Sequence, residues 1–142
     1  MRKVVALCFI ISVLLCVSFV NAQDSGSNPN SRVIAYYFHG NFRCYTCYTM
    51  EQYTKEALEA NFKDALAKGK LEFKVVNVEE RGNEHFVNDY QLYTKSLILS
   101  LVKYGKEVKS KNLTKIWEYV RNKQRFFEYV SEEVNNFLKE AQ

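Results

Sequence analysis

The chain has 142 residues, with 20 Lys and Arg against 16 Asp and Glu, so its formal net charge is +4. This length fits one compact domain and excludes a multidomain enzyme. An apolar content of 47% and an aromatic content of 15% exclude a disordered chain, and five Gly with one Pro exclude a collagen-like or low-complexity chain. The net charge is too small to indicate nucleic-acid binding.

The first 22 residues have the pattern of a secretory signal peptide. Two basic residues, Arg2 and Lys3, precede an apolar run over positions 4–20 that is broken only by two serines, and Val20-Asn21-Ala22 is a small-residue cleavage site. We expect cleavage after Ala22. Cleavage removes both basic residues and two of the four cysteines, Cys8 and Cys16.

The apolar run also leaves two alternatives open. It could persist as an uncleaved N-terminal anchor, since its length is at the low edge of a spanning helix, or Cys16 could carry lipid, although Leu15 precedes it where a small residue is preferred. In each case the body of the protein is exported, to the periplasm or the exterior. Disulfides form in such compartments.

The chain beyond the signal begins with a polar segment and continues as a folded pattern. Residues 23–31 are polar and carry the only proline, so we expect a flexible spacer before a domain over residues 32–142. Val33 to Phe38 is a β-branched and aromatic run that predicts a central strand buried on both faces. A helix then opens at Cys44 or Tyr45, with apolar residues every three or four positions as far as Ala65.

The remaining pattern predicts further strands and helices. The expected strands cover residues 71–78, 96–102 and 106–113, and the expected helices cover 83–90, 115–120 and 123–138. The first two strands of the chain are separated by a helix-length crossover and should be parallel. The lysines of the last strand suit a sheet edge. We expect Phe86, Val87 and Tyr90 to face inward, and Thr114 and Asn122 to cap the last two helices.

Both cysteines that remain after cleavage lie in one Cys-x-x-Cys motif between the first strand and the first long helix. At a helix start, the sulfur of Cys44 is near unpaired N–H groups and the positive end of the helix dipole, and Arg43 adds positive charge. In such settings a thiol pKa falls from about 8.5 to roughly 3.5–7.5. Cys47 lies a turn inward, near enough to attack a mixed disulfide.

The order strand, turn, Cys-x-x-Cys and helix, followed by β-α-β-β-α, resembles the thioredoxin-like superfamily over residues 32–138. The resemblance implies a three-layer α/β/α sandwich of order β-α-β-α-β-β-α around a mixed sheet of about four strands. More narrowly, residues 36–47 (YYFHGNFRCYTC), with 71–78, 86–90 and 94–96, are similar to a small exported family labelled "nitrophenyl compound nitroreductase subunit, ArsF type". We do not infer nitroreduction, because no flavin or nicotinamide signature is visible.

The superfamily resemblance implies dithiol–disulfide exchange, with Cys44 as the attacking thiol and Cys47 as the resolving thiol. No other cofactor is expected. The residues expected to support the pair or to face the substrate are His39, Arg43, Tyr45, Thr46, Thr94, Lys95 and Ser96.

Three features depart from the thioredoxin pattern. The dipeptide between the cysteines is Tyr45-Thr46, unlike the common Gly-Pro, Gly-His, Pro-His or Pro-Tyr, so the resemblance implies no particular reduction potential. Thioredoxins place a cis-proline just before the third of these strands, where this chain has Thr94-Lys95-Ser96, so we expect a trans bond and a changed substrate groove. The buried acid that thioredoxins keep six residues before the first cysteine falls on Phe38. His39 is the nearest titratable residue, either as a proton shuttle or as a turn histidine bonded to the backbone.

Other interpretations of the motif remain. A structural disulfide would close too short a loop to stabilise the fold much, and a tetrahedral metal site would have only His39 and His85 as obvious further ligands. The aromatic residues around the motif either form a substrate-binding rim or belong to the core; they are Tyr36, Tyr37, Phe42, Tyr45 and Tyr48.

The sequence therefore predicts an exported, monomeric thiol–disulfide oxidoreductase whose partner is a protein disulfide or dithiol, with a membrane redox protein as one such partner and no role for nucleic acid. The alternative is a non-catalytic thioredoxin-fold protein, either an accessory subunit of a redox complex or a metal-handling protein. The residues do not determine the direction of electron flow.

Overall fold

A computed structural model describes residues 30–142. The predicted signal peptide with Cys8 and Cys16, and all but the end of the predicted spacer, lie outside the described residues. The strands are β1 (Ser31–His39), β2 (Leu71–Asn77), β3 (Ser96–Lys103) and β4 (Lys106–Asn112), and the helices are α1 (Tyr45–Asn61), α2 (Lys63–Ala67), α3 (His85–Asp89), α4 (Ile116–Tyr119) and α5 (Lys123–Glu140).

The four strands form one mixed sheet in the order β2-β1-β3-β4. β1 pairs with β2 in parallel and with β3 in antiparallel, and β4 pairs antiparallel to β3 at the edge. β1 is therefore central, as its apolar run predicts. The register places Phe38 opposite Ser96, so the end of β1 that leads to the cysteines lies beside the start of β3.

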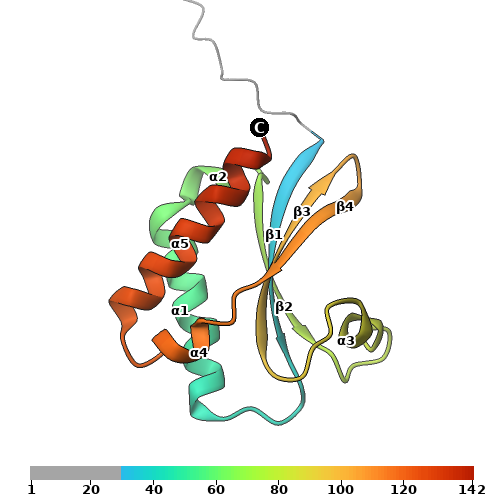
Figure 1. The fold of residues 1–142 in the computed structure, drawn as a ribbon, viewed down its shortest axis with the longest axis vertical. Helices are drawn as coiled ribbons and strands as arrows, with labels where there is room; N and C mark the ends of the chain where they lie inside the picture. Colours follow the sequence, from blue (N-terminus) through green and yellow to red (C-terminus); the bar gives the residue numbers. More distant parts are fainter. Residues whose placement is uncertain (1–29) are drawn as a thin grey trace, which may run out of the picture.

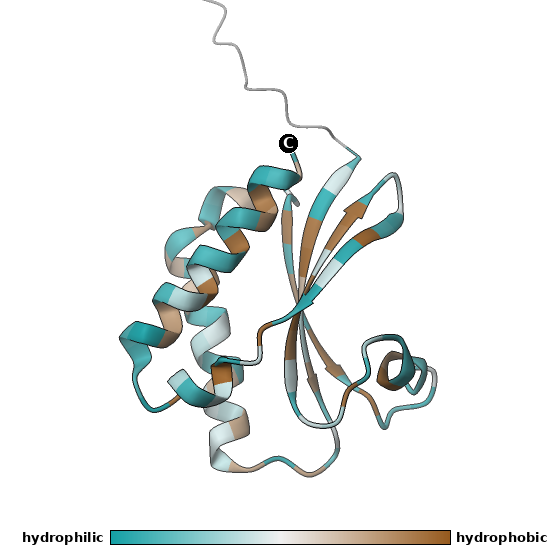
Figure 2. Ribbon diagram, viewed as in Figure 1, coloured by the Kyte–Doolittle hydropathy of each residue, from teal (hydrophilic) through white to brown (hydrophobic). Residues whose placement is uncertain are grey.

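Helices cover the two faces of the sheet unequally (Figure 1). The long helices α1 and α5 pack together on one face, over a core that includes Val33, Ala35 and Tyr37 of β1. The opposite face carries the short α3, whose Phe86 packs against Phe38 with ring centres 5.1 Å apart. Figure 2 shows hydrophobic residues along the central strands and hydrophilic residues along the outward side of α5. The expected α/β/α architecture and thioredoxin-like element order are confirmed.

The first helix is shorter than its apolar period predicts. α1 ends at Asn61, because Phe62 leaves helical geometry at φ −133° and ψ 31°, and the chain resumes as the one-turn α2. Asn61 Nδ2 donates a hydrogen bond to the carbonyl of Ala57, at 3.2 Å, and such a side-chain bond in the last turn competes with helix continuation. Phe62 still packs against the core, which explains why periodicity alone does not reveal the break.

Three expectations about the later elements have different outcomes. Asn122 caps α5 as expected, with its Oδ1 accepting from the backbone N–H of Arg125 at 3.1 Å. Thr114 does not cap α4, because that helix begins one residue later and has Lys115 at its N-cap. Val87 is exposed, because α3 is too short to turn a third residue onto the sheet. Phe86 and Tyr90 of this segment do face inward.

The strand β4 is fully exposed, as expected of a charged sheet edge. Its lysines pair with the last helix: Lys109 Nζ lies 2.7 Å from a carboxylate oxygen of Glu140, and Lys111 Nζ lies 2.7 Å from one of Glu133. These ion pairs tie two of the three lysines of the edge strand to α5.

Candidate functional site

The two cysteines occupy the first turn of α1. Cys44 is the N-cap residue and is exposed, whereas Cys47 is 1% exposed. The backbone N–H of Cys47 donates to the Cys44 carbonyl at 3.0 Å, and the two Sγ atoms lie 2.6 Å apart. The Cys44 sulfur is therefore accessible to a partner, and the Cys47 sulfur contacts it from the buried side.

This arrangement shifts the two thiols in opposite directions. Hydrogen bonds from the Cys47 thiol and from the Cys47 backbone N–H hold the pKa of Cys44 below its usual range. Burial raises the pKa of the Cys47 thiol, and its hydrogen bond to Cys44 adds to the rise. The helix start thus favours a thiolate on the exposed sulfur and a proton on the buried one, which is the division of roles that exchange needs.

Arg43, expected to place positive charge beside the cysteines, is turned toward α1. Its guanidinium forms an ion pair with Glu51 and lies 4.2 Å from the centre of the Tyr48 ring. The Glu51 carboxylate therefore balances much of the charge of Arg43. Through these two contacts, Arg43 fixes the loop before Cys44 against α1.

A buried tyrosine lies behind the cysteines, and sequence reasoning did not assign it this place. The Tyr37 hydroxyl donates to the carbonyl of Cys47 at 2.7 Å, and burial raises the Tyr37 pKa well above its usual range. Phe38, at the position where thioredoxins keep an acid, faces the other side and stacks on Tyr36. The signal that could have indicated this role is the hydroxyl itself, because a tyrosine within a buried apolar strand needs a hydrogen-bond partner.

Replacing Tyr37 with phenylalanine should lower the free energy of unfolding by about 1 kcal/mol, because a buried hydrogen bond is lost. Because the Tyr37 pKa is raised, the folded state keeps its proton above about pH 10, whereas the unfolded chain releases it. The stability that the buried hydroxyl contributes is therefore present below about pH 10 and is lost at higher pH. The variant should therefore lose less stability than the wild type in alkaline solution.

Denaturant titrations at neutral pH and at about pH 11 measure both effects of Tyr37→Phe. Tyr93→Phe is the matched control, because it removes the same hydroxyl from a side chain that is 93% exposed. Equal stabilities of the wild type and Tyr37→Phe at both pH values would contradict the prediction.

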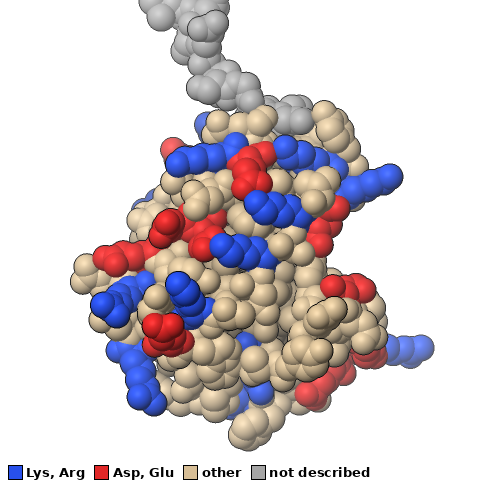
Figure 3. Space-filling view, in the orientation of Figure 1, with Lys and Arg blue, Asp and Glu red and all other residues tan. Residues whose placement is uncertain are grey.

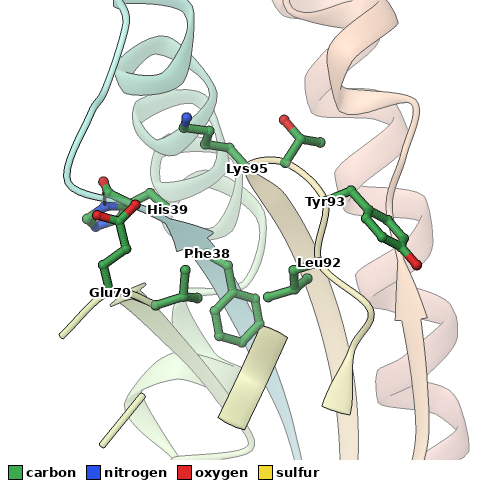
Figure 4. A pocket seen from close by; sticks show the side chains of 9 residues that line it. Phe38, His39, Glu79, Leu92, Tyr93 and Lys95 are labelled. Atoms are coloured by element: carbon green, nitrogen blue, oxygen red, sulfur yellow. Dashed lines mark hydrogen bonds between the residues drawn. The ribbon is translucent and has the colours of Figure 1, made fainter. Parts of the chain in front are cut away.

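His39 lies at the rim of a pocket of about 170 Å³ beside the end of β1. Its Nδ1 is 2.9 Å from the Gly40 carbonyl, which agrees with a turn histidine bonded to the backbone. Figure 4 shows Glu79 next to His39 and Lys95 on the other side of the opening. A Cβ on Gly40 would overlap the Glu79 carboxylate, which is the end of a flexible side chain and would have to move aside.

Thr94 and Lys95 line this pocket, and Ser96 follows them as the first residue of β3. Every peptide bond between residues 30 and 142 is trans, as expected without proline at this place. Ser96 Oγ donates to the Thr94 carbonyl at 3.0 Å, and the indole N–H of Trp117 donates to the Lys95 carbonyl at 3.0 Å. Helix α4 thereby holds the segment in place beside the start of α1.

The aromatic residues around the motif divide between rim and core. Tyr37 is fully buried and Tyr36 packs under α3, whereas Phe42, Tyr45 and Tyr48 are exposed around Cys44. Phe42 is 79% exposed. Figure 3 shows few charged side chains at the lower end of the molecule, where the loop into α1 lies. The exposed sulfur therefore lies among exposed aromatic side chains. Thr46, between the cysteines, is half-buried.

Neither a metal site nor a membrane-spanning helix is found among residues 30–142. In this part of the chain, no group of three or more His, Cys, Asp or Glu side chains is placed to hold a metal ion. His85, an expected surface residue, is exposed and bonded to Asp89. No helix among these residues has the length and apolar character that crossing a membrane would require.

The chain was compared with known families and structures. No protein-family profile matches the sequence, and no curated protein aligns with it. Thioredoxin O2 from Arabidopsis thaliana, in the oxidized state, is a similar structure with 11% sequence identity and a TM-score of 0.41, over 68% of this chain and 76% of that one. Thioredoxin from Fasciola hepatica shows 25% identity and a TM-score of 0.38, over 66% and 82%. Mitochondrial thioredoxin 3 from Saccharomyces cerevisiae, in its oxidized form, shows 14% identity and a TM-score of 0.39, over 63% and 77%.

Proposed function

We propose that the protein is a thiol–disulfide oxidoreductase that exchanges a disulfide with a protein partner. The observation that carries this proposal is the asymmetry of the pair: Cys44 is exposed at a helix start with a lowered pKa, and its sulfur contacts the buried Cys47. A purely structural disulfide would need neither an exposed sulfur nor a shifted pKa. The proposal applies to either direction of electron flow.

The mechanism follows from the different surroundings of the two sulfurs. The Cys44 thiolate attacks one sulfur of the partner disulfide, a mixed disulfide forms, and the other partner sulfur leaves with the electron pair and takes a proton from solvent. Cys47 then loses its proton and attacks Cys44 Sγ, which breaks the mixed disulfide and releases the second partner thiolate. The partner is reduced by two electrons and the cysteine pair is oxidised. The reverse sequence oxidises a partner dithiol.

The cellular location and the partner are part of the same proposal. The signal-like pattern over positions 1–22 supports export to the periplasm or the exterior, and the motif around Cys44 supports membership of the exported ArsF-type family. The exposed aromatic rim supports a protein partner, which can be a membrane redox protein. We propose that the chain acts as a monomer.

The reduction potential of the cysteine pair tests the proposed function. Purified protein is equilibrated with mixtures of a dithiol and its disulfide, the thiols are alkylated, and the reduced fraction is measured by mass spectrometry. We expect a two-electron transition between about −120 and −270 mV, the range of exchange proteins, with the oxidising end indicating an oxidant and the reducing end a reductant. A pair that stays fully oxidised or fully reduced across these mixtures would contradict the proposal.

A further inference from the structure

The pocket beside the end of β1 lies within reach of a partner that is bound at the exposed cysteine. Gly40 lines the pocket and precedes Cys44 by four residues, so the two Cα atoms are at most about 15 Å apart. A side-chain bond ties the loop between them to the end of β2, because Asn77 Nδ2 donates to Asn41 Oδ1 at 2.7 Å. A residue near the reacting cysteine of the partner can therefore enter this pocket.

The pocket has the size and the floor of a site for one side chain. Its volume of about 170 Å³ lies below the range of about 300–1,000 Å³ that is typical of cofactor and small-molecule sites. Phe38, Val78 and Leu92 line it with apolar surface, and Figure 4 shows the Phe38 and Leu92 side chains next to each other. A long side chain can lay an apolar stem on this surface and keep a charged end at the rim.

Glu79 supplies a carboxylate at the rim of the pocket. In the described part of the chain, this carboxylate forms no ion pair with a lysine, an arginine or a histidine. Lys95 also lines the pocket, but its ammonium lies 5.9 Å from the ring centre of Phe42, and Figure 4 shows it directed away from the pocket floor. The charge that a ligand in the pocket meets is therefore negative.

The surface around Glu79 favours the same kind of ligand. Residues 79–89 carry four carboxylates against one arginine, and Figure 3 shows acidic side chains gathered over the segment that contains α3. Such a surface attracts a basic segment and repels an acidic one. Tyr93 is exposed and lines the pocket, so its ring is available to stack on a guanidinium group.

We propose that this pocket receives an arginine or lysine side chain of the partner protein, close to the partner cysteine that reacts with Cys44. The inference rests on the proposed function and describes the partner by its chemistry: a basic residue within about four positions of the reacting cysteine. The stem of that residue lies on the apolar floor, and its charged end meets Glu79. The pocket positions the partner and takes no part in the transfer of electrons.

Short peptides with one cysteine bonded to a coloured aromatic thiol test this inference. The Cys44 thiolate of the reduced protein attacks the peptide sulfur, the disulfide breaks, and the aromatic thiolate leaves with the electron pair, so its colour gives the rate. Arginine is placed two, three or four positions from the cysteine on either side, and norleucine replaces it in the matched peptide. For the wild type, we expect at least one arginine peptide to react about two- to fivefold faster than its norleucine counterpart, as for an exposed ion pair.

Variants of Glu79 show whether the pocket is the source of this preference. Glu79→Gln should bring the ratio of the two rates close to one, and Glu79→Lys should make a peptide with glutamate at the same position the faster one. Glu80→Gln is the matched control, because it removes a neighbouring exposed carboxylate that does not line the pocket, and it should keep the preference.

The possible failures are distinguishable. Equal rates of all arginine and norleucine peptides with the wild type would overturn the inference alone, and so would a preference that survives in Glu79→Gln. A wild-type protein that releases no coloured thiolate from any peptide would overturn the proposed function.

Discussion

Replacing Cys44 with serine should abolish disulfide exchange, whereas replacing Cys47 with serine should leave the first half of the reaction intact and stop the second. Cys44 is the exposed sulfur with the lowered pKa, so its loss removes the only thiol that is exposed to a partner among the described residues. Without Cys47, nothing resolves the mixed disulfide. The Cys47→Ser protein should therefore accumulate covalently bound to its partner.

Both variants can be measured with a disulfide-bonded protein substrate and non-reducing electrophoresis followed by mass spectrometry. We expect turnover below detection for each variant, and an adduct through Cys44 only in Cys47→Ser. The double variant is the control and should form no adduct. An adduct in Cys44→Ser that is as abundant as in Cys47→Ser would show that the roles of the two cysteines are wrongly assigned.

Replacing Phe126 with alanine should lower the free energy of unfolding by about 3–5 kcal/mol, because it opens a cavity between the two long helices. Phe126 of α5 is 0% exposed and meets the ring of Tyr53 of α1 edge-on, with centres 5.6 Å apart. A loss of this size is a large part of the stability of a small domain. Because α1 carries the cysteines, the variant should also lose exchange activity at temperatures where the wild type keeps it.

Chemical denaturation followed by circular dichroism measures the loss caused by Phe126→Ala. Phe42→Ala is the matched control, because it deletes the same atoms from a side chain that is 79% exposed, and it should change stability by less than about 0.5 kcal/mol. Similar losses in the two variants would show that Phe126 is not part of a tightly packed core.

The elements with strong periodicity could be predicted from the sequence. The apolar run of β1, the lysines of β4 and the cap at Asn122 are local patterns, and the structure places each as expected. The cysteine pair could also be located, because a Cys-x-x-Cys at a strand-to-helix transition is a local signal. The division into an exposed and a buried cysteine follows from the helical turn between them.

The surroundings of the pair could not be predicted in the same way, because they depend on contacts between distant segments. Arg43, in the loop before α1, meets Glu51 within that helix, and the indole of Trp117 meets the Lys95 carbonyl from another element. In β1, neighbouring aromatic residues point to opposite faces, so only the folded sheet shows that Tyr37 and not Phe38 lies behind Cys47. Residue type alone does not indicate which face meets the helix.

The contact between Trp117 and the Lys95 carbonyl also gives the protein an internal optical reporter. Trp117 is the only tryptophan in the sequence and is 40% exposed, so its emission depends on both solvent and the hydrogen bond of its indole N–H. A change of redox state or the arrival of a partner that displaces the 94–96 segment would alter that bond. The emission spectrum of the unlabelled protein would then follow events at the cysteine pair.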